Sequence, residues 1–277
     1  MHKDAARQKK DKLVKNLQDT GSLLVAFSGG VDSTFLLAVA HEALGERVAA
    51  ATSNSFIHPA RETQDARDFA RERGIHHVVF ESREMDLPDF VSNSPERCYH
   101  CKKQIIQSLS EIAQELGLEH TAHGANVDDL KDYRPGARAA SEAGVIAPLI
   151  DVGLGKDEIR FLSREMGLAA WDKPPMACLA SRIPYGEPIT IEKLKMIGDA
   201  EELLVEKGFR QFRVRHHGSV ARIEVEGPEI QGITEPGLRK KLVEKFRQIG
   251  FRHISVDLEG YMSGSLNRGL ENERGKE

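Results

Sequence analysis

The sequence predicts an α/β fold: a parallel β-sheet with helices on both faces, followed by a smaller C-terminal α+β domain. In the first part of the chain, short apolar runs alternate with longer segments of helical periodicity, which is the pattern of strands joined by crossover helices. Prolines then accumulate between Lys173 and Gly186, where they interrupt both helices and central strands. Beyond this break, two alternating strand patterns flank Gly218 and indicate a second, smaller unit.

Each element is predicted from hydrophobic periodicity. Four apolar runs predict buried strands at residues 23–27, 47–51, 77–80 and 120–123. Four segments with apolar residues at helical spacing predict helices at residues 34–44, 60–73, 103–116 and 156–166. Glycine follows each of the last three, and glycine commonly ends a helix. In the C-terminal part, the same criteria predict helices at residues 191–207 and 238–249 and strands at residues 212–216, 220–226 and 253–258.

These elements divide the chain into four parts. Residues 1–172 form the α/β domain, and residues 173–190 form a linker that carries Cys178. Residues 191–266 form the small α+β domain, which we expect to serve substrate binding or oligomerisation. Residues 267–277 are a polar tail that we predict to be disordered.

The composition is that of a globular protein. Of the 277 residues, 40% are hydrophobic and 30% charged, and the formal net charge is −4, without the overall basicity that favours nucleic-acid binding. The first residues lack the apolar stretch of a secretory signal, and no run approaches the roughly 18 apolar residues that span a membrane. We therefore expect a cytoplasmic protein with no membrane partner, and RNA contact only through a local patch.

The hexapeptide SGGVDS directly follows the first predicted strand. Gly29 and Gly30 permit unusual dihedral angles and a close backbone approach, Ser28 and Ser33 add hydroxyl donors, and the following helix presents its positive N-terminus. These features predict a phosphate cradle. A carboxylate repels phosphate unless a cation lies between them, so Asp32 indicates Mg²⁺ bound to a polyphosphate. The alternative is a tight turn in which an aspartate and a serine cap a helix.

SGGVDS resembles the signature of the PP-loop ATP pyrophosphatases, which cleave ATP between the α- and β-phosphates and adenylate a carbonyl oxygen of their substrate. The resemblance implies that this loop holds the departing pyrophosphate with Mg²⁺ and that residues 52–55, Ser53 among them, lie near the adenine. Residues 123–129 resemble a second turn of that family, in which Gly124 permits close approach to the nucleotide. Asp128 and Asp129 either serve Mg²⁺ or cap the next turn.

The three cysteines are too few for a disulfide framework and suggest metal binding or catalysis. Cys98 and Cys101 form a C-x-x-C pair, and Cys178 stands alone. Three thiolates can hold three corners of a 4Fe-4S cluster and leave the fourth iron open for sulfide. The alternatives are a redox dithiol, a structural zinc site completed by His100, and a Cys178 that is only a core residue. A thioredoxin-type pair is expected to open a helix after the first strand, and Cys98 does not follow the first strand.

A narrower resemblance covers nearly the whole chain. Residues 132–136 (DYRPG), 178–186 (CLASRIPYG), 212–218 (FRVRHHG) and 221–225 (ARIEV) resemble the LarE family. That family makes the sulfur-containing groups of the nickel-pincer nucleotide, the cofactor of lactate racemase, from pyridinium-3,5-biscarboxylic acid mononucleotide. The resemblance implies an ATP-dependent sulfurtransferase: ATP adenylates a substrate carboxylate, and sulfur then displaces AMP to leave a thiocarboxylate. It also implies a homo-oligomer and a downstream nickel-insertion enzyme as partner.

The same resemblance implies roles for individual residues. In the best-known form of the family, the cysteine that corresponds to Cys178 gives up its own sulfur and becomes dehydroalanine. The added Cys98 and Cys101 resemble the three-cysteine variants, in which a cluster could carry sulfide. We expect Asp32 and Cys178 to be catalytic. The expected cofactors are ATP, Mg²⁺ and a 4Fe-4S cluster held by the three cysteines.

The expected substrate site lies in the C-terminal part. Arg213 and Arg215 are two residues apart on a predicted strand and therefore face the same side, where they could clamp the mononucleotide phosphate. The alternative is a pair of exposed arginines on an edge strand. The family resemblance adds Ser181 and Arg182, close to Cys178, to the lining of this site. It also adds Glu201 and Glu224, which bind a metal, orient the substrate or are merely solvated. The pair His216–His217 is predicted to lie in a surface turn.

Three other functions compete with this one. A tRNA thiolation enzyme also joins a PP-loop to cysteines, but needs an electropositive RNA-binding surface. An ammonia-dependent synthetase explains SGGVDS and leaves the cysteines without a role. A nucleotide sensor binds ATP without chemistry, and substrate-dependent release of pyrophosphate would exclude it.

Overall fold

The computed structural model describes residues 3–131, 135–175, 177–262 and 264–267. By their contacts, the residues form two compact units. Unit 1 comprises Met1–Ser55, Ala60–Phe90 and Glu96–Met176, and unit 2 comprises Phe56–Pro59, Val91–Pro95 and Ala177–Glu277. Two short segments from the first part of the chain therefore belong to the C-terminal unit. In the described part of the chain, no helix combines the length and apolarity needed to cross a membrane.

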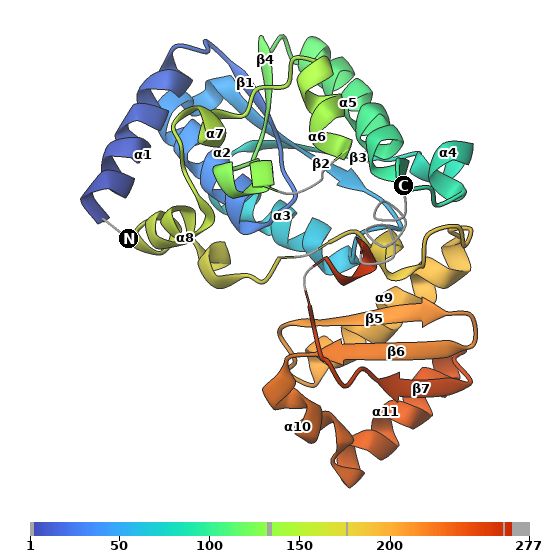
Figure 1. Ribbon diagram of the computed structural model, residues 1–277. Helices are drawn as coiled ribbons and strands as arrows, with labels where there is room; N and C mark the ends of the chain where they lie inside the picture. Colours follow the sequence, from blue (N-terminus) through green and yellow to red (C-terminus); the bar gives the residue numbers. More distant parts are fainter. Residues whose placement is uncertain (1–2, 132–134, 176, 263, 268–277) are drawn as a thin grey trace, which may run out of the picture. The chain divides into compact units, whose positions relative to one another are not determined.

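Unit 1 is built on a four-stranded parallel sheet (Figure 1). Its strands are β1 (Leu23–Ala26), β2 (Val48–Asn54), β3 (His76–Glu81) and β4 (His120–His123), in the order β3-β2-β1-β4. In the central strand, Leu23 pairs with Val48 of β2 and with His120 of β4. The parallel sheet predicted from the sequence is confirmed, with all four strands in their predicted places.

Helices cover both faces of this sheet. One face packs against α1 (Lys3–Gln18), α2 (Val31–Leu44), α3 (Ala60–Glu72) and α8 (Lys156–Glu165). The other face packs against α5 (Arg97–Glu115), beside which lies α6 (Pro135–Glu142). Alternate residues of β1 point to opposite faces, so that Leu23 joins the first core and Leu24 the second. Because both faces are buried, the strand is apolar at every position.

The connections between strands create a switch point in the sheet. The chain moves from β1 to β2 to β3 through α2 and α3 on one face, then returns to the far side of β1 through α5 on the other. The carboxyl ends of β1 and β4 therefore lie side by side where the chain direction diverges, and this is where ligands bind in open parallel sheets. Both glycine-containing turns singled out in the sequence leave these two strands.

Unit 1 contains helices that were not predicted, α6 among them, and the predicted helices α2 and α5 begin earlier than expected. Helix α1 was not predicted, because its sequence is mostly polar and only Ala6, Leu13 and Leu17 are buried. Helix α5 begins at Arg97 rather than at residue 103, so the C-x-x-C pair lies in its first turn. Short helices α4 (Pro88–Val91) and α7 (Pro148–Asp151) complete the named α-helices up to residue 165.

Unit 2 is the small α+β domain that the sequence predicts. Its sheet consists of β5 (Phe212–His217), β6 (Val220–Val225) and β7 (His253–Val256), with β5 antiparallel and β7 parallel to β6. The helices are α9 (Ile191–Glu206), α10 (Ile230–Thr234) and α11 (Pro236–Ile249). The core joins α9 and α11 to the sheet through side chains such as Leu204, Val214, Ile223 and Phe246.

The prediction of a surface turn at His216–His217 is wrong for His216. Strand β5 continues through both residues, and the turn follows at Gly218, which has φ of 59°. Adjacent residues of a strand face opposite sides, so His217 is exposed while only 4% of His216 is accessible. The His216 ring packs 5.6 Å from the ring of Phe251.

Candidate active site

The loop after β1 is a turn that leads directly into α2. Gly29 has φ of 69°, a left-handed conformation that glycine adopts without strain. Gly30 is the N-cap of α2 and, having no side chain, gives the helix no side-chain cap. The first N–H groups of a helix have no partner within the helix and carry its partial positive charge. The loop therefore presents donors to an anion at the switch point of the sheet.

Two serine hydroxyls hold this loop in shape. Ser33 Oγ accepts a hydrogen bond from Ser28 N at 3.3 Å and donates one to Gly30 O at 3.2 Å. Ser28 Oγ lies 3.1 Å from Ser33 Oγ and accepts from Gly30 N at 3.4 Å. The sequence-predicted serines therefore fix the backbone of the cradle.

Gly124 follows β4 and lies against the start of α2. A Cβ atom at this position would come within 2.8 Å of Ser33 N and 3.0 Å of Ser33 Cα, too close for any side chain. The sequence predicted that this glycine permits close approach to a nucleotide. The structure shows that it permits close approach of two backbone segments, the turn after β4 and the start of α2, while its approach to a nucleotide stays a prediction.

Asp32, in the first turn of α2, carries the charge of this loop. Lys156 Nζ donates to Asp32 Oδ2 at 2.6 Å, and Asp32 Oδ1 is buried with no hydrogen-bond partner among the described residues. Burial raises the pKa of the Asp32 carboxyl, and the ammonium of Lys156 opposes this shift. A buried carboxylate oxygen that has no donor fits a bound cation such as Mg²⁺.

Two lysines of the site were missed by sequence analysis. Lys156 lies in the first turn of α8, where the helix dipole disfavours a cation; that unfavourable position was the one available signal. Lys173 follows the last helical turn of unit 1 and reaches Gly29 O at 3.3 Å and Asp65 Oδ2 at 2.9 Å. Both ammonium groups thus lie at the loop that the sequence assigns to pyrophosphate.

Ser53 and the two aspartates after Gly124 have different surroundings. Ser53 Oγ, on β2, is buried without a hydrogen-bond partner among the described residues. Asp128 Oδ2 accepts from Lys156 N at 2.8 Å, and Asp129 Oδ2 accepts from Asn126 N at 3.0 Å. Both aspartates therefore accept hydrogen bonds from backbone N–H groups, and the role toward Mg²⁺ that the sequence left open stays a prediction.

The cysteines are divided between the two units. Cys98 is exposed and Cys101 buried; they lie three residues apart in the first turn of α5, hence on one face of the helix. Cys98 lies at the start of a helix, but this helix follows β3 and not the first strand, as a thioredoxin-type pair would require. Cys178 belongs to unit 2. Within the described residues, no group of three or more His, Cys, Asp or Glu side chains is placed to hold a metal ion.

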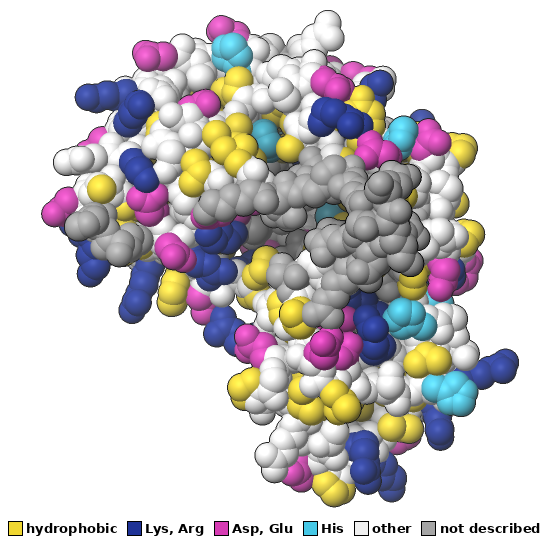
Figure 2. Space-filling model, viewed as in Figure 1, with side chains coloured by type: hydrophobic (Ala, Val, Ile, Leu, Met, Phe, Trp, Pro, Cys, Tyr) yellow, Lys and Arg dark blue, Asp and Glu magenta, His cyan; other side chains and the backbone are white. Residues whose placement is uncertain are grey.

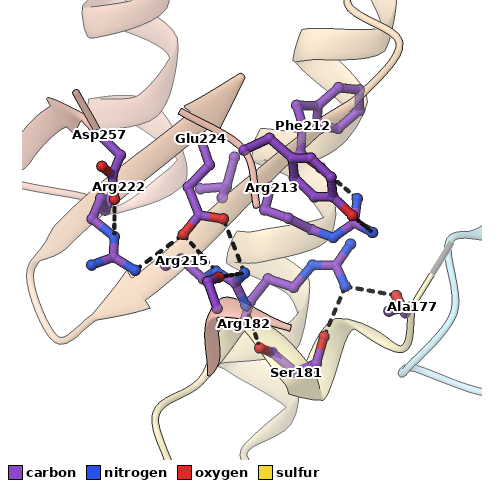
Figure 3. Close-up of polar contacts among 12 residues, drawn as sticks. Ala177, Ser181, Arg182, Phe212, Arg213, Arg215, Arg222, Glu224 and Asp257 are labelled. Carbon is purple, nitrogen blue, oxygen red and sulfur yellow. Dashed lines mark hydrogen bonds and ion pairs between the residues drawn. The ribbon is translucent and has the colours of Figure 1, made fainter. Parts of the chain in front are cut away.

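Arg182 follows Cys178 by one short turn and is completely buried. Its Nε and Nη2 donate to the two carboxylate oxygens of Glu201 at 2.8 and 2.9 Å. Its Nη1 points toward the backbone of the Cys178 segment, where Ala177 O accepts at 2.7 Å (Figure 3). Arg182 and Glu201 are thus paired with each other, and Glu201 is not solvated.

A second buried ion pair involves the predicted phosphate ligand Arg215. Its Nε and Nη2 each donate at 2.9 Å to the carboxylate of Glu224, and its Nη1 donates to Ser181 O at 2.8 Å (Figure 3). Arg222 Nη2 also donates to Glu224 Oε1, at 3.0 Å, and Arg222 Nε lies 3.4 Å from Asp257. Only 1% of Glu224 is exposed. The alternative of solvated glutamates is therefore excluded for this residue as well.

Arg213 lies on the same strand and is also buried. It donates to Phe212 O at 2.6 Å, and its guanidinium lies 4.9 Å from the ring centre of Tyr261. Burial and the guanidinium groups of Arg182 and Arg215 lower the pKa of Arg213. The alternative of exposed edge-strand arginines is wrong for both residues, since each is only 6% exposed. An anion bound here would relieve the repulsion among these three cations.

Comparison with known proteins gives the following similarities. A family model described as asparagine synthase matches residues 10–127. The chain is 43% identical over 247 residues to the uncharacterized protein slr1717 of Synechocystis sp., covering 89% of this chain and 92% of that protein. It is 34% identical over 260 residues to pyridinium-3,5-bisthiocarboxylic acid mononucleotide synthase of Lactiplantibacillus plantarum, covering 94% of both chains. It is also 28% identical over 262 residues to the uncharacterized protein MJ0830 of Methanocaldococcus jannaschii, covering 91% of this chain and 96% of that protein.

Proposed function

The chain belongs to the PP-loop ATP pyrophosphatase family, as a homologue of the LarE proteins, and we propose that it is an ATP-dependent sulfurtransferase acting on pyridinium-3,5-biscarboxylic acid mononucleotide. The observation that carries this proposal is the surroundings of Cys178: its segment is hydrogen-bonded to Arg182 and Arg215, and the buried guanidinium groups of Arg213 and Arg215 are able to attract an anionic substrate. The synthase of Lactiplantibacillus plantarum, similar over nearly its whole length, is named for making pyridinium-3,5-bisthiocarboxylic acid mononucleotide, the product that two thiolations of this substrate would give.

The first step is adenylation. A carboxylate oxygen of the substrate attacks the α-phosphorus of ATP, the bond to the β-phosphate breaks, and pyrophosphate leaves. The helix N-terminus behind Gly29 and the ammonium groups of Lys156 and Lys173 stabilise the leaving charge. Asp32 would hold Mg²⁺, which neutralises phosphate charge when bound. Ser53 would contact the adenine end of the nucleotide.

The second step is transfer of sulfur to the acyl adenylate. A sulfur nucleophile attacks the activated carbonyl carbon, the bond to AMP breaks, and AMP leaves. If the nucleophile is the Cys178 thiolate, the product is a thioester; removal of the Cα proton and cleavage of the Cβ–S bond then release the thiocarboxylate and leave dehydroalanine. Each chain would then act once per sulfur.

The more specific form of this proposal is that a 4Fe-4S cluster supplies sulfide for repeated turnovers. Cys98 and Cys101 lie on one face of α5, as two neighbouring ligands of a 4Fe-4S cluster would, and Cys178 would be the third. The support is the residue chemistry and the family resemblance, since the described residues contain no assembled group of metal ligands. Arg213 and Arg215, close to Ser181, would bind the phosphate of the mononucleotide.

The decisive experiment separates the two steps. Purified protein is given ATP and the mononucleotide, and pyrophosphate and thiocarboxylate are measured for wild type and for Cys178→Ala. We expect the variant to release pyrophosphate and form no thiocarboxylate, because it lacks only the sulfur-bearing group. A variant that still forms thiocarboxylate would refute the role of Cys178, and absence of pyrophosphate release from wild type would refute this substrate.

Iron analysis tests the source of sulfide. Anaerobically purified wild type should contain about four iron and four acid-labile sulfide atoms per chain, as a single 4Fe-4S cluster requires. The variant Cys98→Ala/Cys101→Ala should contain neither. Cluster-free wild type after reconstitution would leave Cys178 as a sacrificial donor.

The competing functions have less support. Lys, Arg, Asp and Glu side chains are interspersed over the described part of the face drawn in Figure 2, rather than segregated as an RNA-binding surface requires. An ammonia-dependent synthetase gives no role to the Cys178 segment or its arginine partners. The homo-oligomer and the nickel-insertion partner remain predictions.

A further inference from the structure

The contacts of Arg182 leave it little capacity to bind a substrate. A guanidinium has five N–H groups on three nitrogens, and all three nitrogens of Arg182 donate hydrogen bonds. Two N–H groups are used by the Glu201 carboxylate. The two hydrogens of Nη1 meet three acceptors: Ala177 O at 2.7 Å, Ser181 Oγ at 2.9 Å and Cys178 O at 3.2 Å. The side chain is fully buried, with 0% exposed.

These contacts act on the backbone that carries the cysteine. Arg182 donates to the backbone carbonyl groups of Ala177 and Cys178. The chain forms a tight turn after the cysteine, because Ser181 N donates to Cys178 O at 2.9 Å. On the other side of the cysteine, Leu179 N donates to Ile57 O at 2.8 Å. Cys178 therefore lies between two anchored peptide groups.

Glu201 connects this arrangement to the core of unit 2. Its Oε1 accepts from Val214 N at 3.0 Å in addition to Arg182 Nε. Val214 is a core residue of β5, and Glu201 itself lies on α9. The position of the cysteine backbone is thus fixed relative to the strand that carries Arg213 and Arg215.

We propose that Arg182 and Glu201 are positioning residues for Cys178 in sulfur transfer, and not ligands of the substrate. This inference rests on the proposed function. Because a thiolate reacts only when it is held close to the carbonyl carbon and aligned with it, loss of the pair slows the sulfur step. Adenylation uses the loop of unit 1 and does not depend on this pair.

The test uses a variant that removes both charges. In Arg182→Met/Glu201→Leu, side chains of comparable size replace the pair, a change that often preserves stability when both partners of a buried ion pair are replaced. The single variant Glu201→Gln provides a second test if the double variant does not fold. Leu204→Ala is the matched control, since it creates a core defect on α9 without altering any contact of Cys178.

Two measurements are made on each variant. In single-turnover reactions, we expect the thiocarboxylate formed per adenylate to fall about tenfold to a hundredfold, the loss expected for hydrogen bonds to a charged group. The KM of the mononucleotide, measured by pyrophosphate release, should stay at the wild-type value. In a Cys98→Ala/Cys101→Ala background, iodoacetamide should alkylate Cys178 faster in the double variant than in Leu204→Ala.

Each outcome decides the proposal. A raised KM with unchanged thiocarboxylate yield would show that Arg182 and Glu201 bind substrate. Equal losses in Leu204→Ala and in the double variant would show a general effect of a weakened unit. If wild type forms no thiocarboxylate, the proposed function fails, and the alkylation rates still test whether the pair fixes the cysteine.

Discussion

The loop after β1 in unit 1 and the Cys178 segment in unit 2 hold their functional groups by different means. The first is formed by backbone: glycines, helix N–H groups and two short hydroxyl side chains. The second is formed by buried side chains, with the ion pairs Arg182–Glu201 and Arg215–Glu224 at its centre. Their exposures also differ, since the Lys156 and Asp32 side chains of the loop are 32% and 21% exposed while those of Arg182 and Glu201 are 0% and 2% exposed.

This difference separates groups that can change partner from groups that cannot. An ammonium at a partly open ion pair can transfer to an incoming phosphate at small cost, because solvent screens both charges. If a fully buried guanidinium moves away from its carboxylate, both groups become unpaired charges inside the protein, which costs several kcal/mol of stability. We therefore expect the loop of unit 1 to respond to ligands and the arginine group of unit 2 to stay fixed.

The largest effect is expected from Asp32→Asn. The change removes the charge that would hold Mg²⁺ while keeping the side-chain shape, so pyrophosphate release should fall by two to three orders of magnitude, roughly the effect of losing one electrostatic group at a transition state. The fold should persist, because burial already disfavours the charged form of Asp32. The control Asp65→Asn alters an exposed partner of Lys173 and should retain activity. Wild-type pyrophosphate release in Asp32→Asn would contradict this role.

The second largest effect tests the buried pairs of unit 2. Glu224→Gln leaves two guanidinium groups beside a neutral amide, and the free energy of unfolding should fall by about 3–5 kcal/mol, as when one partner of a buried ion pair is removed. The same substitution at Glu42, half exposed and paired with Lys10, should change it by less than about 1 kcal/mol. Urea unfolding followed by circular dichroism measures both. Similar changes in the two variants would remove the contrast between buried and exposed pairs.

The two regions also differ in how far the sequence predicts them. The strand-to-helix turn of the loop was predicted, because the need for glycine, a hydroxyl or a short acidic side chain at a fixed place in such a turn is visible in consecutive residues; its role toward the nucleotide stays a prediction. The sheet and its helices were predicted for the same reason, since periodicity is local. The start of α5 was misplaced because the residues of its first turn, including Cys98, have no apolar periodicity.

The arginine group was predicted only as a set of residues. The sequence shows Arg182 and Glu201 nineteen positions apart, and nothing in either segment indicates that they form a pair. The sequence does not distinguish a buried glutamate from a solvated one, so the burial of Glu201 could be learned only from the structure. Lys156 was missed for a related reason: its partner Asp32 lies 124 residues away.

A smaller effect is expected from pH at the edge of the loop. Burial and the charge of Lys102 lower the pKa of His123 from 6.5 to about 4, against the opposing charge of Asp129. A histidine with a lowered folded pKa binds fewer protons than in the unfolded chain, so its stabilisation is present above pH 6.5 and is lost as the pH falls toward 4. Over that whole range the loss is at most about 3.5 kcal/mol, at about 1.4 kcal/mol per pKa unit. Urea unfolding at pH 7.5 and pH 5, values chosen at roughly one unit or more from the unfolded pKa, should show a smaller loss for His123→Gln than for wild type. Equal losses would assign the pH dependence to other groups.

The smallest effect concerns the backbone of the cradle. In Gly124→Ala, the new methyl group meets Ser33 N at 2.8 Å, and the resulting displacement should lower the free energy of unfolding by about 1–3 kcal/mol, as overpacking does. The same substitution at Gly237, in the first turn of α11, meets no atom within 4 Å and should be neutral or stabilising, because alanine favours helix. Fluorescence of the single tryptophan, Trp171, follows the unfolding of unit 1 in Gly124→Ala, circular dichroism follows the unfolding of unit 2 in Gly237→Ala, and titration with ATP measures binding. Because the cradle is backbone, Gly124→Ala should weaken ATP binding as well as stability. A variant that lost stability and kept wild-type affinity would show that the turn after β4 supports α2 without shaping the nucleotide site.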